Sequence, residues 1–558
     1  MGQLYKTAIF SPFLTDINGL WFMGQSLGEG SESLPVVTPT DTGWGNYAFK
    51  RGVRTWAQGD HSTDPEGRSK SDFTFVSLTA AANGGLGETI ANGVADHLKA
   101  AFVRSTTAPA RPAPPHFLVA YAGQGGRTIE ELSIADESTD PRTPTVKQGG
   151  GGFYKTSLDD ARRAAQQAKA QRQDFFIAAL LWMQGEANGG PTGGIVPSRW
   201  KSEIPPPEGQ HWYRDRLLAY RKQWSTDLIA ITEQKGEIPM FTYQTLGPAA
   251  DAQLMAADTD PFLYLVGPHY AVASALNSRT TLGRYGAAIH LSADGQRWLG
   301  EQFAKVIRRA LAEREDWQPL RPRKAWIDAS RTSVLVDFAV PRPPLVIDDE
   351  FLPLQQSALG KEFSTLCGFR VRNPAGAVPP MTAVEVESPT SVRIKLASPL
   401  SQGVGYTLSY GSPFAGVLGL ISTIRPGPMS ADQATTELLV KDIAATRLKL
   451  LVDEGAFYVM NTEPGAALAQ ATIRHTHEES GFTVLRFENR ELRNSVPFAA
   501  GQTLSALRPF SYGNVRDSDS EPAIYPFADA TYGNRAGRPY PLWNWCVLFN
   551  DLAIAEAP

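Results

Sequence analysis

Apolar runs alternate with stretches of helical periodicity up to about residue 315. The runs predict strands over residues 20–26, 117–122, 175–182, 238–244 and 261–266. Helical spacing covers residues 86–103, 158–171, 212–233 and 293–315. Ser157 stands just before the second of these helices as a predicted N-cap. Nearly continuous apolar strands separated by helices predict a parallel sheet covered on both faces, which binds ligands at the carboxyl ends of its strands.

The pattern changes after about residue 318, where prolines become frequent and the apolar runs become short. Alternation typical of half-buried antiparallel strands occurs over residues 333–339, 384–387, 391–397, 447–452 and 482–487. The stretch 426–432 contains two prolines and a glycine, and it predicts a linker into a small strand-rich block that ends near residue 505. The sequence therefore predicts an α/β half followed by a mostly β half.

Composition and charge narrow the class of protein. The chain has 558 residues, of which 42% are apolar and 20% charged, as in globular proteins. A net charge of -4 without a long Lys/Arg block argues against a nucleic-acid partner. The first residues lack the features of a signal peptide, and no apolar run is long enough to span a bilayer. We expect no membrane partner, and the sequence leaves a homo-oligomer open.

The two cysteines, Cys367 and Cys546, are too few for a disulfide framework. One bridge and two buried thiols both remain open. Export by another route, earlier removal of a signal, and release as part of a virus particle are likewise compatible with the sequence.

The first predicted strand ends in Gly24-Gln25-Ser26-Leu27-Gly28, which matches the G-x-S-x-G nucleophile pattern. Such a pattern arises easily by chance in a chain with 50 glycines. In the α/β-hydrolase fold the nucleophile follows several strands, whereas this serine follows the first one. We therefore reject that fold and keep Ser26 as a candidate nucleophile.

Polar or glycine residues follow other strands of the same predicted sheet. Gly125 and Gly126 follow the second strand, Gln184 ends the third, and His290 lies between the fifth strand and the last helix. Each has an ordinary explanation, as a turn, a polar strand end or a structural histidine. Because parallel strands end at one edge, however, all four positions can converge with Ser26. A histidine there suits a general base, and backbone N–H groups or an amide suit an oxyanion hole.

Two other features have a weaker interpretation. His475 and His477 share one face of a predicted strand, but without a third ligand in the sequence we predict no metal site. Trp543 and Trp545 also share a face, where they either stack on a sugar or pack in a β core.

These motifs resemble those of the SGNH hydrolase superfamily, most closely the sialate O-acetylesterase-like carbohydrate esterases. That branch has Gly-Gln-Ser-Asn, a Gly-Gly-Thr loop, Gln-Gly-Glu and Asp-x-x-His in this order. The corresponding stretches here are 24–26, 125–128, 182–186 and 290–292. The resemblance covers roughly residues 18–315 and implies a five-stranded parallel-sheet, flavodoxin-like hydrolase domain.

The sequence departs from this pattern at two positions. Leu27 replaces the usual Asn, and Ala287 stands three residues before His290 where the pattern has Asp. That Asp orients the imidazole and stabilises its protonated form in a Ser-His-Asp triad. Three explanations remain open: a Ser–His pair with another orienting acceptor, a weakened or binding-only site, and an introduced Ala substitution.

The resemblance implies roles for the motif residues. Ser26 is the nucleophile and His290 the base, with neither metal nor organic cofactor. The oxyanion donors are the N–H of Ser26, an N–H of Gly125 or Gly126, and the amide of Gln184. Residues expected to bind substrate or to hold the site are Gln25, Arg127 and Glu186.

The second half resembles, more loosely, the β-sandwich that accompanies such esterases in secreted bacterial and phage tail proteins. The implied domains are an esterase domain (1–318), a sandwich in two parts (319–428 and 506–558) and a small β-rich insertion (429–505). The expected function is hydrolysis of O-acetyl groups on a carbohydrate or polysaccharide, outside the cell or on a virion tail. The alternatives are a polysaccharide-binding protein with a weakened site, such as a phage receptor-binding protein, and a lipase or arylesterase on the same fold.

Overall fold

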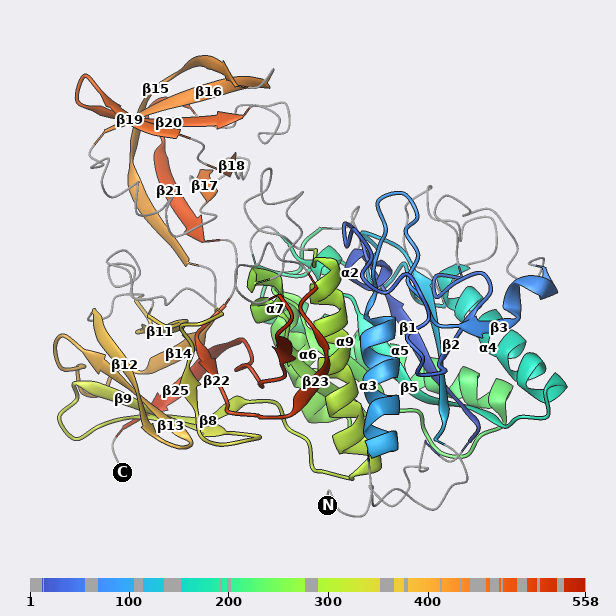
Figure 1. Cartoon of the computed structure of the whole chain (residues 1–558). Helices are drawn as coiled ribbons and strands as arrows, with labels where there is room; N and C mark the ends of the chain where they lie inside the picture. Colours follow the sequence, from blue (N-terminus) through green and yellow to red (C-terminus); the bar gives the residue numbers. More distant parts are fainter. Residues whose placement is uncertain are drawn as a thin grey trace. The chain divides into compact units, whose positions relative to one another are not determined.

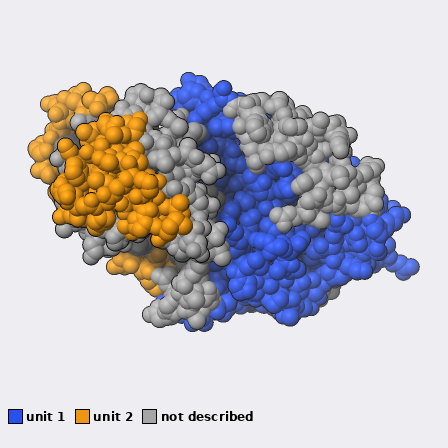
Figure 2. Space-filling view, turned by 90° about the horizontal axis from the view of Figure 1, so that it is seen from above, with its two compact units in different colours: residues 1–278, 289–320, 518–545 blue, residues 279–288, 321–517, 546–558 orange. Residues whose placement is uncertain are grey.

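The chain divides into two units (Figure 2). Unit 1 comprises residues 1–278, 289–320 and 518–545, and unit 2 comprises residues 279–288, 321–517 and 546–558. A computed structural model describes residues 13, 15–55, 69–104, 114–134, 152–190, 193–197, 202–275, 290–351, 366–375, 380–411, 414–430, 433–441, 458–461, 471–472, 475–488, 499–508, 512–528 and 536–556. The position of Ala287 lies outside these residues. The domain boundaries expected from the sequence stay a prediction.

Unit 1 is built on a mostly parallel sheet, which has seven strands among the described residues (Figure 1). Its strands lie in the order β3-β2-β4-β1-β5-β6-β7. They are β1 (Ile17–Gly24), β2 (Tyr47–Phe49), β3 (Phe75–Ser77), β4 (His116–Gly123), β5 (Phe175–Met183), β6 (Met240–Gln244) and β7 (Leu263–Pro268). The five predicted strands are β1, β4, β5, β6 and β7, and neighbours among them pair in parallel. The predicted α/β class is thus confirmed, and β2 and β3 extend one edge.

Helices cover this sheet. They are α2 (Ser26–Glu29), α3 (Ile90–Arg104), α4 (Gly152–Ala170), α5 (Glu208–Thr232), α6 (Ala249–Thr259), α7 (Tyr270–Ala275) and α9 (Ala293–Ile307), with the short turns η3 (Lys70–Phe73), η5 (Glu186–Asn188) and η6 (Arg308–Ala312). Helices α3 and α9 pack side by side, as do α4 and α5 (Figure 1). The predicted N-cap at Ser157 is wrong, because α4 begins at Gly152. Ser157 is instead buried inside the helix and accepts a hydrogen bond from Trp224 Nε1 (3.0 Å).

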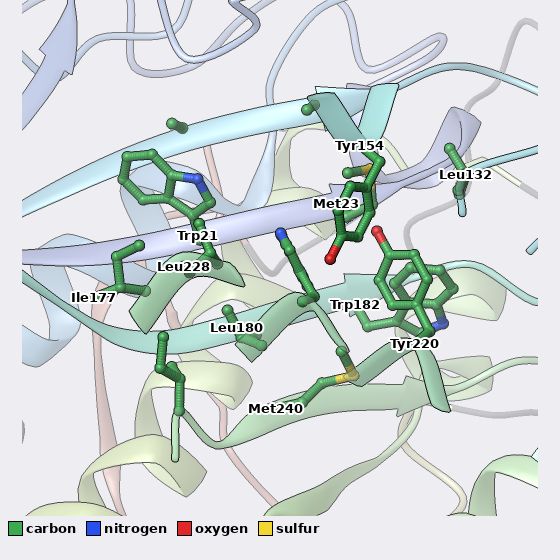
Figure 3. Close-up of a cluster of buried hydrophobic side chains, with 14 of the residues drawn as sticks. Trp21, Met23, Leu132, Tyr154, Ile177, Leu180, Trp182, Tyr220, Leu228 and Met240 are labelled. Atoms are coloured by element: carbon green, nitrogen blue, oxygen red, sulfur yellow. The ribbon is translucent and has the colours of Figure 1, made fainter. Parts of the chain in front are cut away.

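Large aromatic side chains fill the core between the sheet and helices α4 and α5 (Figure 3). Trp21 on β1 and Trp182 on β5 are both almost completely buried. The ring of Trp182 lies 4.7 Å from that of Tyr220 on α5. Burying a side chain of this size stabilises the fold by roughly 1.5–3 kcal/mol. This packing fixes the carboxyl ends of β1 and β5, where the predicted site residues lie.

Unit 2 is rich in β structure. One sheet has the order β11-β14-β25-β8-β9-β13-β12 in the described part of the chain. Its strands are β8 (Arg321–Ile327), β9 (Ser333–Ala339), β11 (Phe369–Arg372), β12 (Met381–Ser388), β13 (Ser391–Leu396), β14 (Tyr406–Tyr410) and β25 (Phe549–Ala555). The C-terminal strand β25 pairs in parallel with β8, and β10 (Val346–Ile347) pairs separately with β22 (Val515–Arg516). The predicted strands 333–339 and 391–397 are confirmed to within a residue, and the one at 384–387 lies inside the longer strand β12.

A second sheet of unit 2 has the order β18-β17-β21-β15-β16-β20-β19 among the described residues. Its strands are β15 (Phe414–Ser430), β16 (Gln433–Lys441), β17 (Tyr458–Asn461), β18 (Ala471–Thr472), β19 (His475–Glu479), β20 (Phe482–Glu488) and β21 (Thr503–Arg508). The predicted strand at 482–487 is confirmed, and the one at 447–452 lies outside the described residues. The predicted linker at 426–432 is wrong, because β15 continues through residues 426–430 and pairs with β16. The Thr435 hydroxyl of β16 also donates to the Pro428 carbonyl of β15 (2.7 Å).

Residues 518–545, the C-terminal strap, belong to unit 1. The strap contains β23 (Pro522–Pro526) and β24 (Pro539–Pro541), which pair with each other. Its Asp519 forms buried ion pairs with Lys305 (3.2 Å) and Arg309 (2.9 Å). Trp545 is buried with its ring 6.0 Å from that of Tyr270. Trp545 therefore packs against helix α7 of unit 1 and not in a β core, as the packing interpretation had it.

Cys367 and Cys546 are both buried thiols. In the described parts of the chain, no helix has the length and hydropathy that a membrane crossing requires.

Candidate active site

Ser26 lies at the carboxyl edge of the sheet. Strand β1 ends at Gly24, Gln25 is extended, and Ser26 begins the short helix α2. Gly24 is required because a Cβ at this position would lie 2.3 Å from the carbonyl oxygen of Met183 on the neighbouring strand. The N–H of Gln25 donates to that same carbonyl (3.0 Å), so the turn is fixed against β5. Ser26 itself is half-buried, and its side chain is placed at the strand end as predicted.

The glycine loop after β4 lies beside Ser26. A Cβ on Gly125 would lie 3.5 Å from Ser26 Cβ, an ordinary contact distance, and 2.6 Å from Glu29 Oε1, so this backbone lies directly beside both side chains. Gly126 has a φ of +69°, in the left-handed region that favours glycine. The structure therefore brings Gly125 next to Ser26. In this state the N–H of Gly125 donates to the carboxylate of Glu29.

Glu29 is a site residue that the sequence analysis missed. It lies on α2, is 7% exposed, and accepts a hydrogen bond from the Ser31 hydroxyl (3.0 Å). Burial raises the pKa of this carboxyl, and the hydrogen bonds from Ser31 and Gly125 and the charges of Arg54 and His290 offset the rise only in part. No motif spacing marks a carboxylate three residues after a nucleophile. A buried carboxyl beside Ser26 and within electrostatic reach of His290 is nevertheless part of the site.

His290 is held close to the segment that follows Ser26. The carbonyl of the next residue, Leu291, accepts the Ser33 hydroxyl (2.8 Å), and Gln296 of α9 donates to the Leu27 carbonyl (2.8 Å). His290 Nδ1 lies 3.2 Å from a carboxylate oxygen of Glu32, with side-chain exposures of 21% and 37%. The predicted base thus shares the edge with Ser26 and Gly125. Glu32 is a second carboxylate that the sequence analysis missed.

Gln184 is placed differently from the prediction. Its side chain is completely buried, and its Nε2 donates to Asn188 Oδ1 (2.6 Å) and to the Arg127 carbonyl (3.2 Å). Its Oε1 accepts the hydroxyl of Tyr213 on α5 (2.6 Å). Because this side chain is completely buried and three internal hydrogen bonds hold it in place, the arrangement does not support Gln184 as an oxyanion donor. It cross-links the loops after β4 and β5.

Gln25 has a similar internal role. Its Oε1 accepts the N–H of Ala187 (3.0 Å) and lies 3.4 Å from Gln184 Nε2. Its carbonyl accepts the hydroxyl of Tyr121 on β4 (3.0 Å). Gln25 therefore ties the end of β1 to the ends of β4 and β5.

Arg127 and Glu186, both expected to bind substrate, are also bonded within the protein. The guanidinium of Arg127 donates to Gln124 Oε1 (2.8 and 3.0 Å) and to Glu131 Oε1 (3.1 Å). The half-buried carboxylate of Glu186 accepts the hydroxyls of Tyr243 (2.6 Å) and Thr245 (2.7 Å). Glu186 thus joins the loop after β5 to the end of β6.

A second histidine lies at this edge but does not suit a base. His269 follows β7, is completely buried, and its Nδ1 lies 3.1 Å from the Gln244 carbonyl. Burial lowers the pKa of this imidazole, although the charge of Glu186 and the Gln244 carbonyl act in the opposite direction. The half-exposed His290 is better placed to exchange protons with a substrate.

Among the residues that the structure describes, no group of three or more His, Cys, Asp or Glu side chains is arranged to hold a metal ion. His477 Nε2 lies 3.5 Å from a carboxylate oxygen of Glu479, but this pair is not part of such a group.

Similarity to known proteins is found among solved structures. No family model matches the chain, and no curated protein matches it. Among solved structures, the carbohydrate acetylesterase XAC1771 from Xanthomonas citri is 16% identical, with 71% of this chain and 75% of that chain covered and a TM-score of 0.43. NanS is 15% identical, with 54% of this chain and 99% of that chain covered and a TM-score of 0.32. Both likenesses are at low sequence identity, and the activity is inferred below from the residues of this chain.

Proposed function

We propose that the protein is a serine esterase that removes O-acetyl groups from a carbohydrate. The observation that supports the proposal is that Gly125 lies beside Ser26, while His290 belongs to a distant segment that is bonded to the residues following Ser26. A hydroxyl, a close backbone N–H and a half-exposed imidazole are the groups that acyl transfer needs. The carbohydrate part of the proposal rests on the resemblance of the motifs.

In the proposed reaction, Ser26 Oγ attacks the ester carbonyl while His290 takes the hydroxyl proton. The negatively charged oxygen of the tetrahedral intermediate accepts hydrogen bonds from the N–H groups of Ser26 and Gly125. The sugar hydroxyl leaves with the proton from His290, and water then hydrolyses the acetyl-serine by the same route. Since the Gly125 N–H donates to Glu29, the developing oxyanion must replace this carboxylate as its acceptor.

The test is acetate release from a panel of O-acetylated polysaccharides, together with p-nitrophenyl acetate hydrolysis. Ser26→Ala is expected to lower kcat by several orders of magnitude, since loss of a serine nucleophile costs roughly 10⁶-fold. Ser71→Ala is the matched control, because Ser71 is exposed and lies on η3, outside the site. Equal thermal unfolding of both variants would exclude misfolding. Undiminished hydrolysis by Ser26→Ala would refute the proposal.

A carbohydrate-binding protein with a weakened site is the second candidate. It is favoured by Ala287 at the position of the expected acid, and by the engagement of the Gly125 N–H with Glu29 in the free protein. Glycan binding by the wild-type chain without any acetate release would favour it. The extracellular or virion-tail location and the lipase alternative stay predictions of the sequence.

A further inference from the structure

We infer that Glu32 is the acid partner of His290, in place of the aspartate that the resembled motif has three residues before its histidine. The inference rests on the proposed function and extends it. His290 Nδ1 lies 3.2 Å from Glu32 Oε2. A carboxylate at Nδ1 holds that nitrogen as the donor, which leaves Nε2 to accept the proton of the serine hydroxyl. Glu32 therefore has the position relative to the imidazole that a triad acid has.

The backbone around Glu32 is fixed by close packing. The N–H of Glu32 donates to the Gly85 carbonyl (2.8 Å). A Cβ on Gly30 would lie 2.1 Å from the Glu88 carbonyl oxygen, and a Cβ on Gly87 would lie 1.9 Å from the Ser33 carbonyl oxygen. Segments 30–33 and 85–88 therefore touch backbone to backbone, and glycines make this approach possible. Glu32 itself has a φ of +62°, a conformation that costs a non-glycine residue energy and that this packing enforces.

The same segment also holds the histidine. Ser33, the residue after Glu32, donates its hydroxyl to the carbonyl of Leu291, the residue after His290. The segment that carries the Glu32 carboxylate is thus bonded to the segment that carries the His290 imidazole, through the residue next to each. The backbones that carry the two side chains are therefore held together, which lowers the ordering cost that makes many exposed ion pairs contribute little.

Two carboxylates face His290, and their surroundings separate their roles. Glu29 is bonded to the Ser31 hydroxyl and the Gly125 N–H, and the charge of Arg54 also acts on it. Glu32 contacts the ring nitrogen directly. When His290 takes the Ser26 proton, the ionised Glu32 stabilises the imidazolium and keeps its own charge, so no further proton moves. Glu32 is a positioning residue because it acts through His290.

The experiment compares Glu32→Gln, Glu32→Asp and Asp72→Asn with the wild-type chain. Asp72 is the matched control, since it pairs with Arg51 at 3.1 Å with exposures of 34% and 23%, and lies on η3 outside the site. Loss of the acid from a buried triad costs about 10⁴-fold in kcat. For this half-exposed pair we expect Glu32→Gln to lower kcat on p-nitrophenyl acetate by about 10–10²-fold, because solvent screens the charge.

Four further readouts separate positioning from a merely structural role. KM should change little in Glu32→Gln, Glu32→Asp should recover part of kcat, and Asp72→Asn should match the wild type. In the Ser26→Ala background, Glu32→Gln should not lower kcat further. Glu32 acts through His290 on the Ser26 hydroxyl, and this hydroxyl is absent from that variant.

The outcomes distinguish this inference from the proposed function. If Glu32→Gln keeps the wild-type kcat while Ser26→Ala abolishes hydrolysis, the protein is a serine esterase and the Glu32 inference is wrong. If Glu32→Gln and Asp72→Asn lower kcat equally, the effect is structural and the inference is again wrong. If Ser26→Ala keeps full activity, the proposed function itself fails.

Discussion

The contact between helices α3 and α9 depends on two glycines. A Cβ on Gly300 of α9 would lie 2.4 Å from the Ile90 carbonyl oxygen and 2.9 Å from Gly93 Cα, both on α3. On the opposite side, a Cβ on Gly93 would lie 2.2 Å from the Arg297 carbonyl oxygen. Ordinary contact begins at 3.4 Å, so Gly300→Ala must move the helices apart by 3.4 - 2.4 = 1.0 Å.

The magnitude follows from two opposing effects. Alanine is favoured over glycine in a helix interior by about 1 kcal/mol. Overpacking costs typically 1–3 kcal/mol, and the upper end applies because backbone atoms cannot rotate away as side chains can. The expected net loss in the free energy of unfolding is about 2 kcal/mol, which corresponds to a fall in Tm of roughly 4–8 °C.

The assay is thermal unfolding, followed together with p-nitrophenyl acetate hydrolysis. His290 precedes α9, so a shift of this helix should lower kcat by more than the loss of stability alone explains. Gly247→Ala is the matched control, because nothing lies within 4 Å of a Cβ at that position; its Tm should stay the same or rise slightly. A Gly300→Ala variant as stable as Gly247→Ala would refute this account of the helix contact.

Two further predictions concern the C-terminal strap. Burial opposes the charging of His97, but hydrogen bonds and charges from Glu301 (2.7 Å) and Glu521 (3.1 Å) outweigh it and raise the pKa of the imidazole. The stabilisation that protonated His97 gives the folded protein is therefore complete below about pH 6.5 and is lost as the pH rises through the folded-state pKa. Tm should fall from pH 6 to pH 9. A His97→Gln variant whose Tm falls equally steeply with pH would contradict this. Tyr540→Phe removes a hydrogen bond to buried Asp294 in the first turn of α9. This should lower the free energy of unfolding by about 1.5–3 kcal/mol and should also lower kcat. Unchanged unfolding and kcat would show that the strap does not support the site.

Much of the fold of unit 1 is predictable from the sequence, because buried parallel strands leave nearly continuous apolar runs. All five such runs form strands of the sheet. Strands β2 and β3 have three residues each, too few to show a pattern. The inner position of Ser157 was not predictable, because serine suits both a helix start and a buried bond to a tryptophan that lies far along the chain.

The site is predictable where topology alone decides it. Ser26 and Gly125 follow adjacent parallel strands, so the sheet brings them together. The sequence does not show which neighbours satisfy a polar side chain. Gln184 accepts a hydrogen bond from Tyr213 on α5. Glu32 contacts His290 because two loops that are distant in the sequence pack together. Neither contact leaves a spacing that a motif could detect.

Covalent labelling of Ser26 tests the central claim most directly. A fluorophosphonate reacts with an activated serine and leaves a stable adduct, whatever the natural substrate. Intact mass and peptide mapping of the wild-type chain should show one adduct, located on Ser26, and Ser26→Ala should show none under the same conditions. An unlabelled wild-type chain, or an adduct on another serine that persists in Ser26→Ala, would contradict the account.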